Sequence, residues 1–133
     1  MLGIWNTLEK PIRILAPMED VTDHVFRDLI ATLGGPDLFF TEFVLADVVA
    51  GVGVDEIEAV SGEYGRLPGR LRRGRFDYPL IAQIWGTRPE SYRVAARNIA
   101  RLGFAGIDIN MGCPIRKIRK HGAGSQLISN PTL

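Results

Sequence analysis

The one cysteine of the sequence lies between a glycine and a proline, in the segment Gly112-Cys113-Pro114, directly after an apolar run typical of a strand. The two flanking residues constrain the backbone and favour a loop that exposes the side chain. A thiol with the ordinary pKa of about 8.5 is mostly protonated at neutral pH. Cys113 is therefore available as a proton donor. Two other interpretations stay open, a thiolate nucleophile and a small buried apolar side chain.

Further polar or unusual residues stand where other predicted strands end. They are Pro17, Met18 and Glu19 after the first strand, Glu42 after the second, Gln83 on the third and Asn110 after the fourth. Gln83 and Asn110 each carry a hydrogen-bond donor and an acceptor. Asn110 is also a common turn residue, and Glu42 is equally well interpreted as a helix cap. In a parallel α/β fold the loops after the strands form the functional face, so we expect these residues to converge there.

Hydrophobic periodicity predicts the elements that hold these residues. Apolar runs predict strands at Ile12–Ala16, Leu38–Thr41, Pro79–Trp85 and Ala105–Asn110. Amphipathic spacing predicts helices at residues 25–33, 42–52 and 89–102, and a further helix beginning near Ser125. Residues 51–78 are rich in glycine and charge, and we expect an irregular insert there. The third strand is apolar nearly throughout, as in a parallel sheet covered on both faces.

The alternation of strands and helices predicts parallel strands with right-handed crossovers. A (β/α)8 barrel needs about 250 residues, whereas this chain has 133. We therefore expect residues 1–133 to form the amino-terminal half of a TIM-type barrel, with about four β/α units. A doubly wound open sheet is the alternative, but its Gly-x-Gly-x-x-Gly fingerprint is missing after the first strand.

The net charge of +1 conceals two halves of opposite sign. Residues 1–65 carry 3 Lys+Arg against 12 Asp+Glu, whereas residues 66–133 carry 13 against 3. One group of cations follows the cysteine, namely Arg116, Lys117, Arg119 and Lys120. A second group lies in the insert, namely Arg66, Arg70, Arg72, Arg73 and Arg75. Such runs are often solvated surface, but both groups are also suited to nucleic-acid phosphates.

Several classes of protein are disfavoured by the sequence. A composition with 46% hydrophobic and 23% charged residues is that of a globular domain. The longest apolar stretch, Phe43–Val54, is shorter than the ~20 residues that span a bilayer. One cysteine and two separated histidines, His24 and His121, do not form a zinc site. With no internal disulfide and no signal peptide, we expect a reducing, cytoplasmic location.

Four segments resemble the tRNA-dihydrouridine synthases, flavoenzymes that reduce particular uridines of tRNA. The segments are APMEDVTDHVFR, FFTEFV, PLIAQIWG and GIDINMGCPIRKIRKHGAGSQLISNP. The last is the most specific, because it joins the cysteine loop to Gly122-Ala123-Gly124. The resemblance runs from about Arg13 to Leu133 and diverges across residues 51–78.

The resemblance implies a chemistry for these residues. FMN would be the cofactor and NADPH the reductant, with hydride passing from reduced flavin to C6 of uracil and a proton passing from Cys113 to C5. Pro17, Met18, Glu19 and Gln83 would border the flavin, and Asn110 would contact flavin or substrate. The cations at 116–120 would bind tRNA phosphates beside the site.

Later parts of the family pattern are missing from these 133 residues, including the later-strand lysine and histidine and the carboxyl-terminal helical domain. We therefore expect the chain alone to bind FMN weakly or not at all. Open sheet edges would favour self-association or pairing with a missing carboxyl-terminal half. Two rival functions remain: a truncated, non-catalytic RNA-binding homologue or structural fragment, and a flavin barrel acting on a free pyrimidine.

Overall fold

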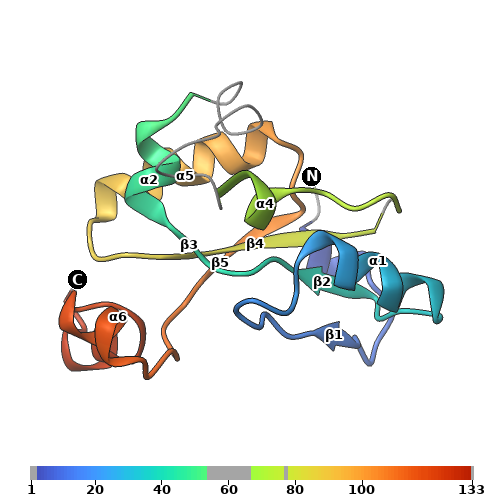
Figure 1. The fold of residues 1–133 in the computed structure, drawn as a ribbon, viewed down its shortest axis with the longest axis horizontal. Coiled ribbons are helices and arrows are strands. Elements are labelled where there is room, and N and C mark those ends of the chain that lie inside the picture. Colours follow the sequence, from blue (N-terminus) through green and yellow to red (C-terminus); the bar gives the residue numbers. More distant parts are fainter. Residues whose placement is uncertain (1–2, 54–66, 77, 133) are drawn as a thin grey trace.

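The computed structural model describes residues 3–53, 67–76 and 78–132, which form a parallel sheet with helices packed on it (Figure 1). The strands are β1 (Ile14–Leu15), β2 (Leu38–Phe40), β3 (Val44–Leu45), β4 (Leu80–Trp85) and β5 (Gly106–Ile109). The helices are α1 (His24–Thr32), α2 (Ala46–Gly51), α4 (Leu67–Leu71), α5 (Pro89–Arg101) and α6 (Arg116–Lys120). Two 3₁₀ helices complete the description, η1 (Ile4–Asn6) and η2 (Gly124–Ser129).

The strands of the sheet follow one another in chain order. β1 pairs with β2, and β4 pairs first with β2 and then with β3 along the same edge. Ile84 of β4 pairs with Val44 on one side and with Ile109 of β5 on the other. Strands β2 and β3 therefore act as one interrupted strand, and the order is that of a barrel wound in a single direction. A doubly wound sheet would reverse direction at its first strand, so this alternative is wrong.

The helices that cover the sheet pack on one of its faces. Side chains of α2 and α5, such as Val49 and Ile99, share a core with Leu80 and Ile84 of β4. Figure 1 shows α2 and α5 side by side above β3 and β4. On the other face, Ile81 packs in a smaller cluster with residues from β2 and the amino-terminal segment, namely Leu38, Phe40, Ile4, Leu8 and Ile12. A barrel has this arrangement, with helices outside and a packed interior.

The sequence predicts most of these elements, with differences at short ones. Asp23 caps α1 by accepting a hydrogen bond from the Phe26 amide at 2.8 Å, and Pro89 occupies the first turn of α5. The helix expected from Glu42 begins only at Ala46, because the preceding residues form β3. The helix expected near Ser125 is the 3₁₀ helix η2, and α6 was not predicted. Within the expected insert the structure has α4, while residues 54–66 and 77 lie outside the described part.

Strands β1 and β5 form the two edges of the described sheet. Ile14 of β1 is 45% exposed and Ile109 of β5 is 47% exposed, so apolar side chains of both edge strands remain accessible. Across the described ranges, no helix has the length and apolar character needed to cross a membrane.

Candidate active site

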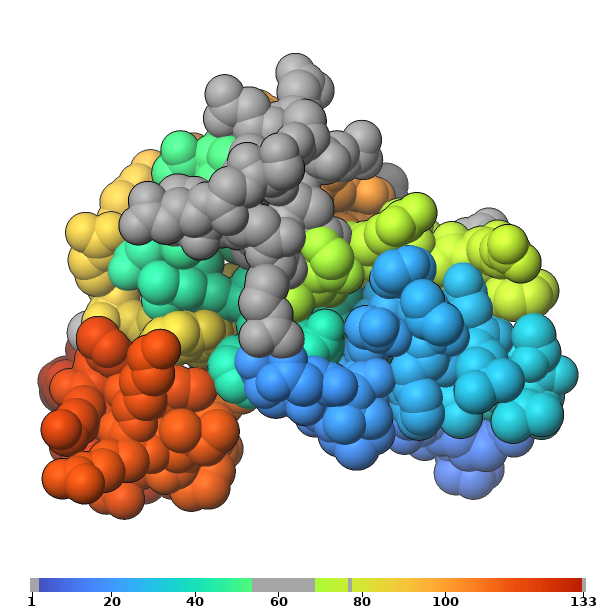
Figure 2. Space-filling view, in the orientation of Figure 1, coloured from blue at the N-terminus to red at the C-terminus, as the bar shows by residue number. Residues whose placement is uncertain are grey.

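The segments after β1, β2 and β5, together with Gln83 of β4, line a cavity of about 510 Å³ at the carboxyl edge of the sheet. Its walls come from Pro17 and Glu19 on one side and from residues 108–115 on the other, with Phe43 and Gln83 between them. In the space-filling view the blue β1–α1 loop and the orange carboxyl-terminal segment stand apart with a hollow between them (Figure 2). Five predicted site residues therefore line one cavity, namely Pro17, Glu19, Gln83, Asn110 and Cys113.

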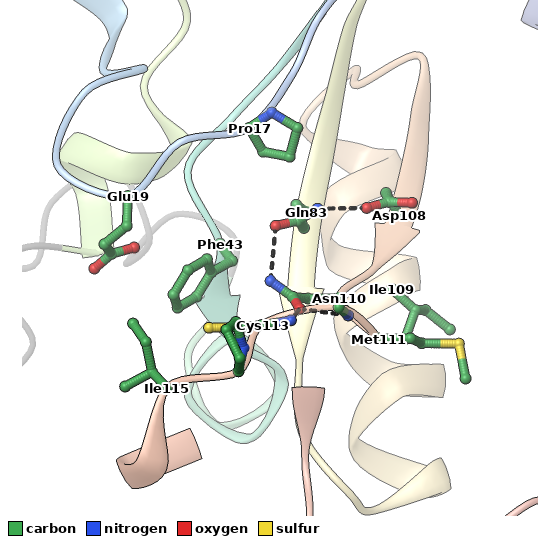
Figure 3. Close-up of a pocket in the computed structure, with 12 residues that line it drawn as sticks. Pro17, Glu19, Phe43, Gln83, Asp108, Ile109, Asn110, Met111, Cys113 and Ile115 are labelled. Atoms are coloured by element: carbon green, nitrogen blue, oxygen red, sulfur yellow. Dashed lines mark hydrogen bonds between the residues drawn. The ribbon is translucent and has the colours of Figure 1, made fainter. Parts of the chain in front are cut away.

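A row of hydrogen-bonded side chains crosses the floor of the cavity (Figure 3). Gln83 donates from Nε2 to Oδ2 of Asp108 at 2.6 Å, and Asn110 donates from Nδ2 to Oε1 of Gln83 at 3.1 Å. The strand register brings this about, because Gln83 and Asp108 are direct partners in the β4–β5 ladder. Gln83 is only 7% exposed, so its amide needs these partners. Within the described residues, each amide retains one N–H that no protein group accepts.

The cysteine loop is fixed by Asn110. Its Oδ1 accepts hydrogen bonds from the main-chain N–H groups of Gly112, at 3.2 Å, and Cys113, at 3.0 Å. This Asx-type turn follows β5 at once and leaves the Cys113 side chain half-buried on the Phe43 side of the cavity (Figure 3). The same amide thus connects the floor of the cavity to the main chain of Cys113.

A glycine closes the cysteine loop from behind. Gly124 has a φ of +58°, and a Cβ built there would lie 2.6 Å from the Cys113 carbonyl oxygen and 2.9 Å from Cγ2 of Ile118. The Ser125 amide donates to the same carbonyl at 3.0 Å. Both the backbone conformation and the space thus require glycine at position 124. This gives a physical reason for the glycines that follow the cysteine in the sequence.

The amino-terminal wall of the cavity is held by a partly buried arginine. Arg70 of α4 donates hydrogen bonds to both carboxylate oxygens of Glu19 and also to the Phe43 carbonyl, at 3.2 Å. Burial alone would lower the pKa of Arg70, but its bonds to Glu19 and the charges of Glu42 and Asp20 raise it above the ordinary value. Arg70 is therefore paired with carboxylates of this protein at the rim of the cavity.

Met18 and Glu42 lie beside the cavity but do not line it. The amide of Met18 donates to Oγ1 of Thr22 at 3.0 Å, and its carbonyl accepts from the Thr22 amide, also at 3.0 Å. Glu42 is 5% exposed and accepts a hydrogen bond from the Asp20 amide at 2.6 Å. Both residues thus support the β1–α1 loop in this structure.

The cations predicted to bind RNA lie on α6, which follows the cysteine loop. Arg116, Lys117, Arg119 and Lys120 are exposed, and Ile118 is the buried side chain that fastens the helix. No carboxylate of the described residues forms an ion pair with them. The cations are thus presented to solvent beside the cavity.

Sequence reasoning missed three contributors to this site. Asp108 was treated only as part of a strand, although an acidic residue in an apolar strand, in register with Gln83, was a usable signal. Phe43 belongs to an apolar stretch and to the segment FFTEFV, and neither identifies it as a site residue. Arg70 was grouped with possible RNA contacts, and no local pattern connects it to Glu19 in the sequence.

The cavity suits a planar, imide-bearing ring. Its size lies in the range of small-molecule sites, about 300–1,000 Å³, and Phe43, Ile109 and Met111 give it apolar walls. The remaining N–H groups of Gln83 and Asn110 can donate to ring carbonyls, and the Cys113 thiol lies nearby. Among the described residues no group of three or more potential ligands could hold a metal ion.

A singly wound parallel sheet with its site in the loops after the strands defines a protein of the (β/α)8-barrel class. Residues 14–133 match the family model described as dihydrouridine synthase (Dus), and the chain belongs to this family. It is 42% identical, over 97% of its length, to a probable tRNA-dihydrouridine synthase of Staphylococcus aureus (strain Mu50). It is 42% identical, over 98% of its length, to probable tRNA-dihydrouridine synthase 2 of Bacillus subtilis (strain 168). The chain spans 37–38% of the length of these relatives, so it covers part of the barrel.

Proposed function

We propose that this chain is the part of an FMN-dependent tRNA-dihydrouridine synthase that carries the proton donor and one wall of the flavin site. The observation that carries the proposal is the joining of Cys113 to the amide row through Asn110, at one cavity. Similarity to relatives named tRNA-dihydrouridine synthase supports the choice of substrate. The resulting reaction converts uridine in tRNA to 5,6-dihydrouridine.

Cys113 acts as the general acid in this proposal. When FMN is bound and has been reduced by NADPH, it supplies the hydride that C6 of the uracil ring receives. The Cys113 S–H bond breaks as a C–H bond forms at C5, and the thiolate regains a proton from solvent. The half-buried position and the Asn110 anchor hold the sulfur in one place for this transfer.

Gln83 and Asn110 orient the rings. Each has one N–H directed to a ligand carbonyl, while its other bonds fix its rotamer. Pro17 and Glu19 form the opposite wall, and the main chain around Met18 completes that loop. The apolar side chains between these walls limit the access of water.

Helix α6 holds tRNA phosphates in this proposal. Its exposed cations lie beside the cavity, where the backbone of a uridine lifted out of its stack would pass. Each phosphate contact adds to the salt dependence of binding. A tRNA substrate also agrees with the proposed cytoplasmic location.

The test of the general acid is Cys113→Ala in the complete protein that carries this chain. We expect dihydrouridine formation to fall by about 10²–10⁴-fold while bound FMN is retained. Cys113→Ser should be similarly inactive, because a hydroxyl is a far weaker acid than a thiol. Unchanged activity of the alanine variant would exclude Cys113 as the proton donor.

The proposed RNA-binding surface on α6 can be tested by measuring tRNA binding over a series of salt concentrations. Lys117→Ala should weaken binding to every tRNA and reduce the slope of log K against log salt by about 1. Arg101→Ala, at the far end of α5, is the matched control and should leave the slope unchanged. Binding of tRNA without any reductase activity in the complete protein would favour the rival RNA-binding function.

We also propose that later β/α units of the barrel cover the edge strands β1 and β5. The chain covers just over a third of its relatives, and apolar residues of both edge strands are accessible. A second copy of the chain is the other occupant to be tested. Light scattering of the 133-residue chain should show association. A well-folded monomer would contradict the pairing of two copies through these edges.

A further inference from the structure

The segment 70–75 is attached to the β1–α1 loop and to the middle of α1 at several points. Arg70 pairs with Glu19, and the buried Arg27 donates to the carbonyl of Arg72. The amide of Arg75 donates to both carboxylate oxygens of Asp28, at 2.9 and 3.0 Å. The sequence placed this segment in an irregular insert, but its main chain and side chains bind a loop that forms part of the cavity.

Arg70 makes the most specific of these contacts. Its side chain is 13% exposed, and its planar guanidinium meets Glu19 with two parallel bonds, a geometry that lysine does not reproduce. Glu42 and Asp20 each have a carboxylate oxygen 3.7 Å from it. The guanidinium carbon also lies 5.9 Å from the centre of the Phe43 ring. One cation thus pairs with a cluster of three carboxylates at the rim of the cavity.

Two residues that Arg70 touches, Glu19 and Phe43, are themselves walls of the cavity. They come from different strand ends, one after β1 and one between β2 and β3, so Arg70 fixes the distance between them. The loop is also strained, because Asp20 has a φ of +59°, which L residues with a side chain rarely adopt. The strain is maintained by the bond from the Asp20 amide to Glu42, which lies 3.7 Å from the Arg70 guanidinium.

We propose that Arg70 is a positioning residue of the flavin pocket, which holds Glu19 against the wall and keeps the β1–α1 loop in its binding conformation. The proposal rests on the proposed function, since it assigns a ligand to the cavity. Without Arg70, the Glu19 carboxylate would turn toward the cavity unpaired. It would then repel an anionic ligand such as FMN, whose phosphate is negatively charged.

The test compares FMN affinity in variants of the complete protein by quenching of flavin fluorescence. Arg70→Ala should raise the FMN dissociation constant about 10- to 100-fold, as expected for loss of a bidentate, charge-assisted contact. Arg70→Lys keeps the charge but loses the planar, two-bond contact with Glu19, so its FMN dissociation constant should remain raised by about fivefold or more. The matched control is Arg75→Ala, because the bonds of Arg75 to Asp28 are made by its main chain.

Hydrogen exchange of the ligand-free protein gives an independent measurement. Arg70→Ala and Arg70→Lys should both speed exchange of the Asp20 amide, whereas Arg75→Ala should not. Glu19→Gln, which keeps the shape of the side chain, replaces Arg70→Ala if that variant fails to fold.

The two measurements separate this inference from the proposed function. If the unaltered protein does not bind FMN, the proposed function fails, and hydrogen exchange alone decides whether Arg70 orders the loop. If the unaltered protein binds FMN but both Arg70 variants keep its affinity within about twofold and leave Asp20 exchange unchanged, the positioning role is wrong.

Discussion

Replacing Gly124 by alanine tests whether position 124, behind the cysteine loop, requires glycine. Two penalties apply at this position. A φ of +58° costs an alanine about 1 kcal/mol. The new methyl group would also lie 2.6 Å from the Cys113 carbonyl oxygen, and overpacking against such a rigid neighbour costs about 1–3 kcal/mol. Alanine lowers the entropy of the unfolded chain, which returns about 0.4–1 kcal/mol. We therefore expect Gly124→Ala to lower the free energy of unfolding by about 1–3.5 kcal/mol.

Two other glycines separate these penalties. Gly122 has a φ of +79°, but its nearest contact is an ordinary 3.5 Å to Cγ2 of Thr87, so Gly122→Ala should cost about 0.5 kcal/mol. Gly51 at the end of α2 has open space and no positive φ, so Gly51→Ala should be neutral or slightly stabilising. Urea denaturation followed by circular dichroism measures all three variants.

The single thiol gives a local readout of the same change. Because Gly124 packs against the Cys113 main chain, Gly124→Ala should displace the loop and speed the reaction of Cys113 with Ellman's reagent under native conditions. Gly122→Ala should leave the rate close to that of the unaltered chain. If Gly124→Ala and Gly122→Ala lose equal stability and react at equal rates, the close approach to the Cys113 carbonyl does not constrain the loop.

Other predictions concern the row on the cavity floor and two titrating groups. Asp108→Ala should lower the free energy of unfolding by about 1–2 kcal/mol, because Gln83 loses its acceptor. Asp108→Asn keeps an acceptor oxygen and should lose less stability. Equal losses in urea denaturation would contradict a stabilising Gln83–Asp108 hydrogen bond. The hydrogen bond and charge of Arg13 lower the pKa of Asp37 to about 2. The stability from this pair should therefore be present above about pH 4 and lost as the pH falls toward 2, and Asp37→Asn should remove that part of the acid dependence. Burial and then the charge of nearby Asp47 raise the pKa of Tyr92 to about 12. Stability should accordingly fall between about pH 10 and 12, and it should fall less in Tyr92→Phe, as measured by thermal unfolding across that range.

Long elements with a clear period could be predicted from the sequence. The apolar run before Gln83 predicts β4, and the spacing of apolar residues in 89–102 predicts α5. The convergence of Gln83 and Asn110 follows from geometry, because parallel strands end at the same edge of the sheet. Strand β3 is only two residues long, so no alternation could reveal it. Helix α6 has one buried residue, Ile118, which lies against Gly124 at the start of η2, and no period within five residues could reveal it.

The division of charge along the chain could be counted but not interpreted from the sequence alone. Glu19 and Arg70 are separated by 51 positions, and only the fold brings them together. Part of the acidic first half is thus neutralised internally by the insert, whereas the cations of α6 face solvent. Net charge and its distribution along the chain do not distinguish these two uses of arginine.

The order of the strands has a consequence for how the protein is made. When β2 and β3 are counted as one interrupted strand, each strand pairs with the one synthesised just before it, from β1 to β5. No described strand has to wait for a later one to fill a gap in the middle of the sheet. The sheet can therefore grow in one direction as the chain leaves the ribosome, with each finished edge serving as the template for the next strand.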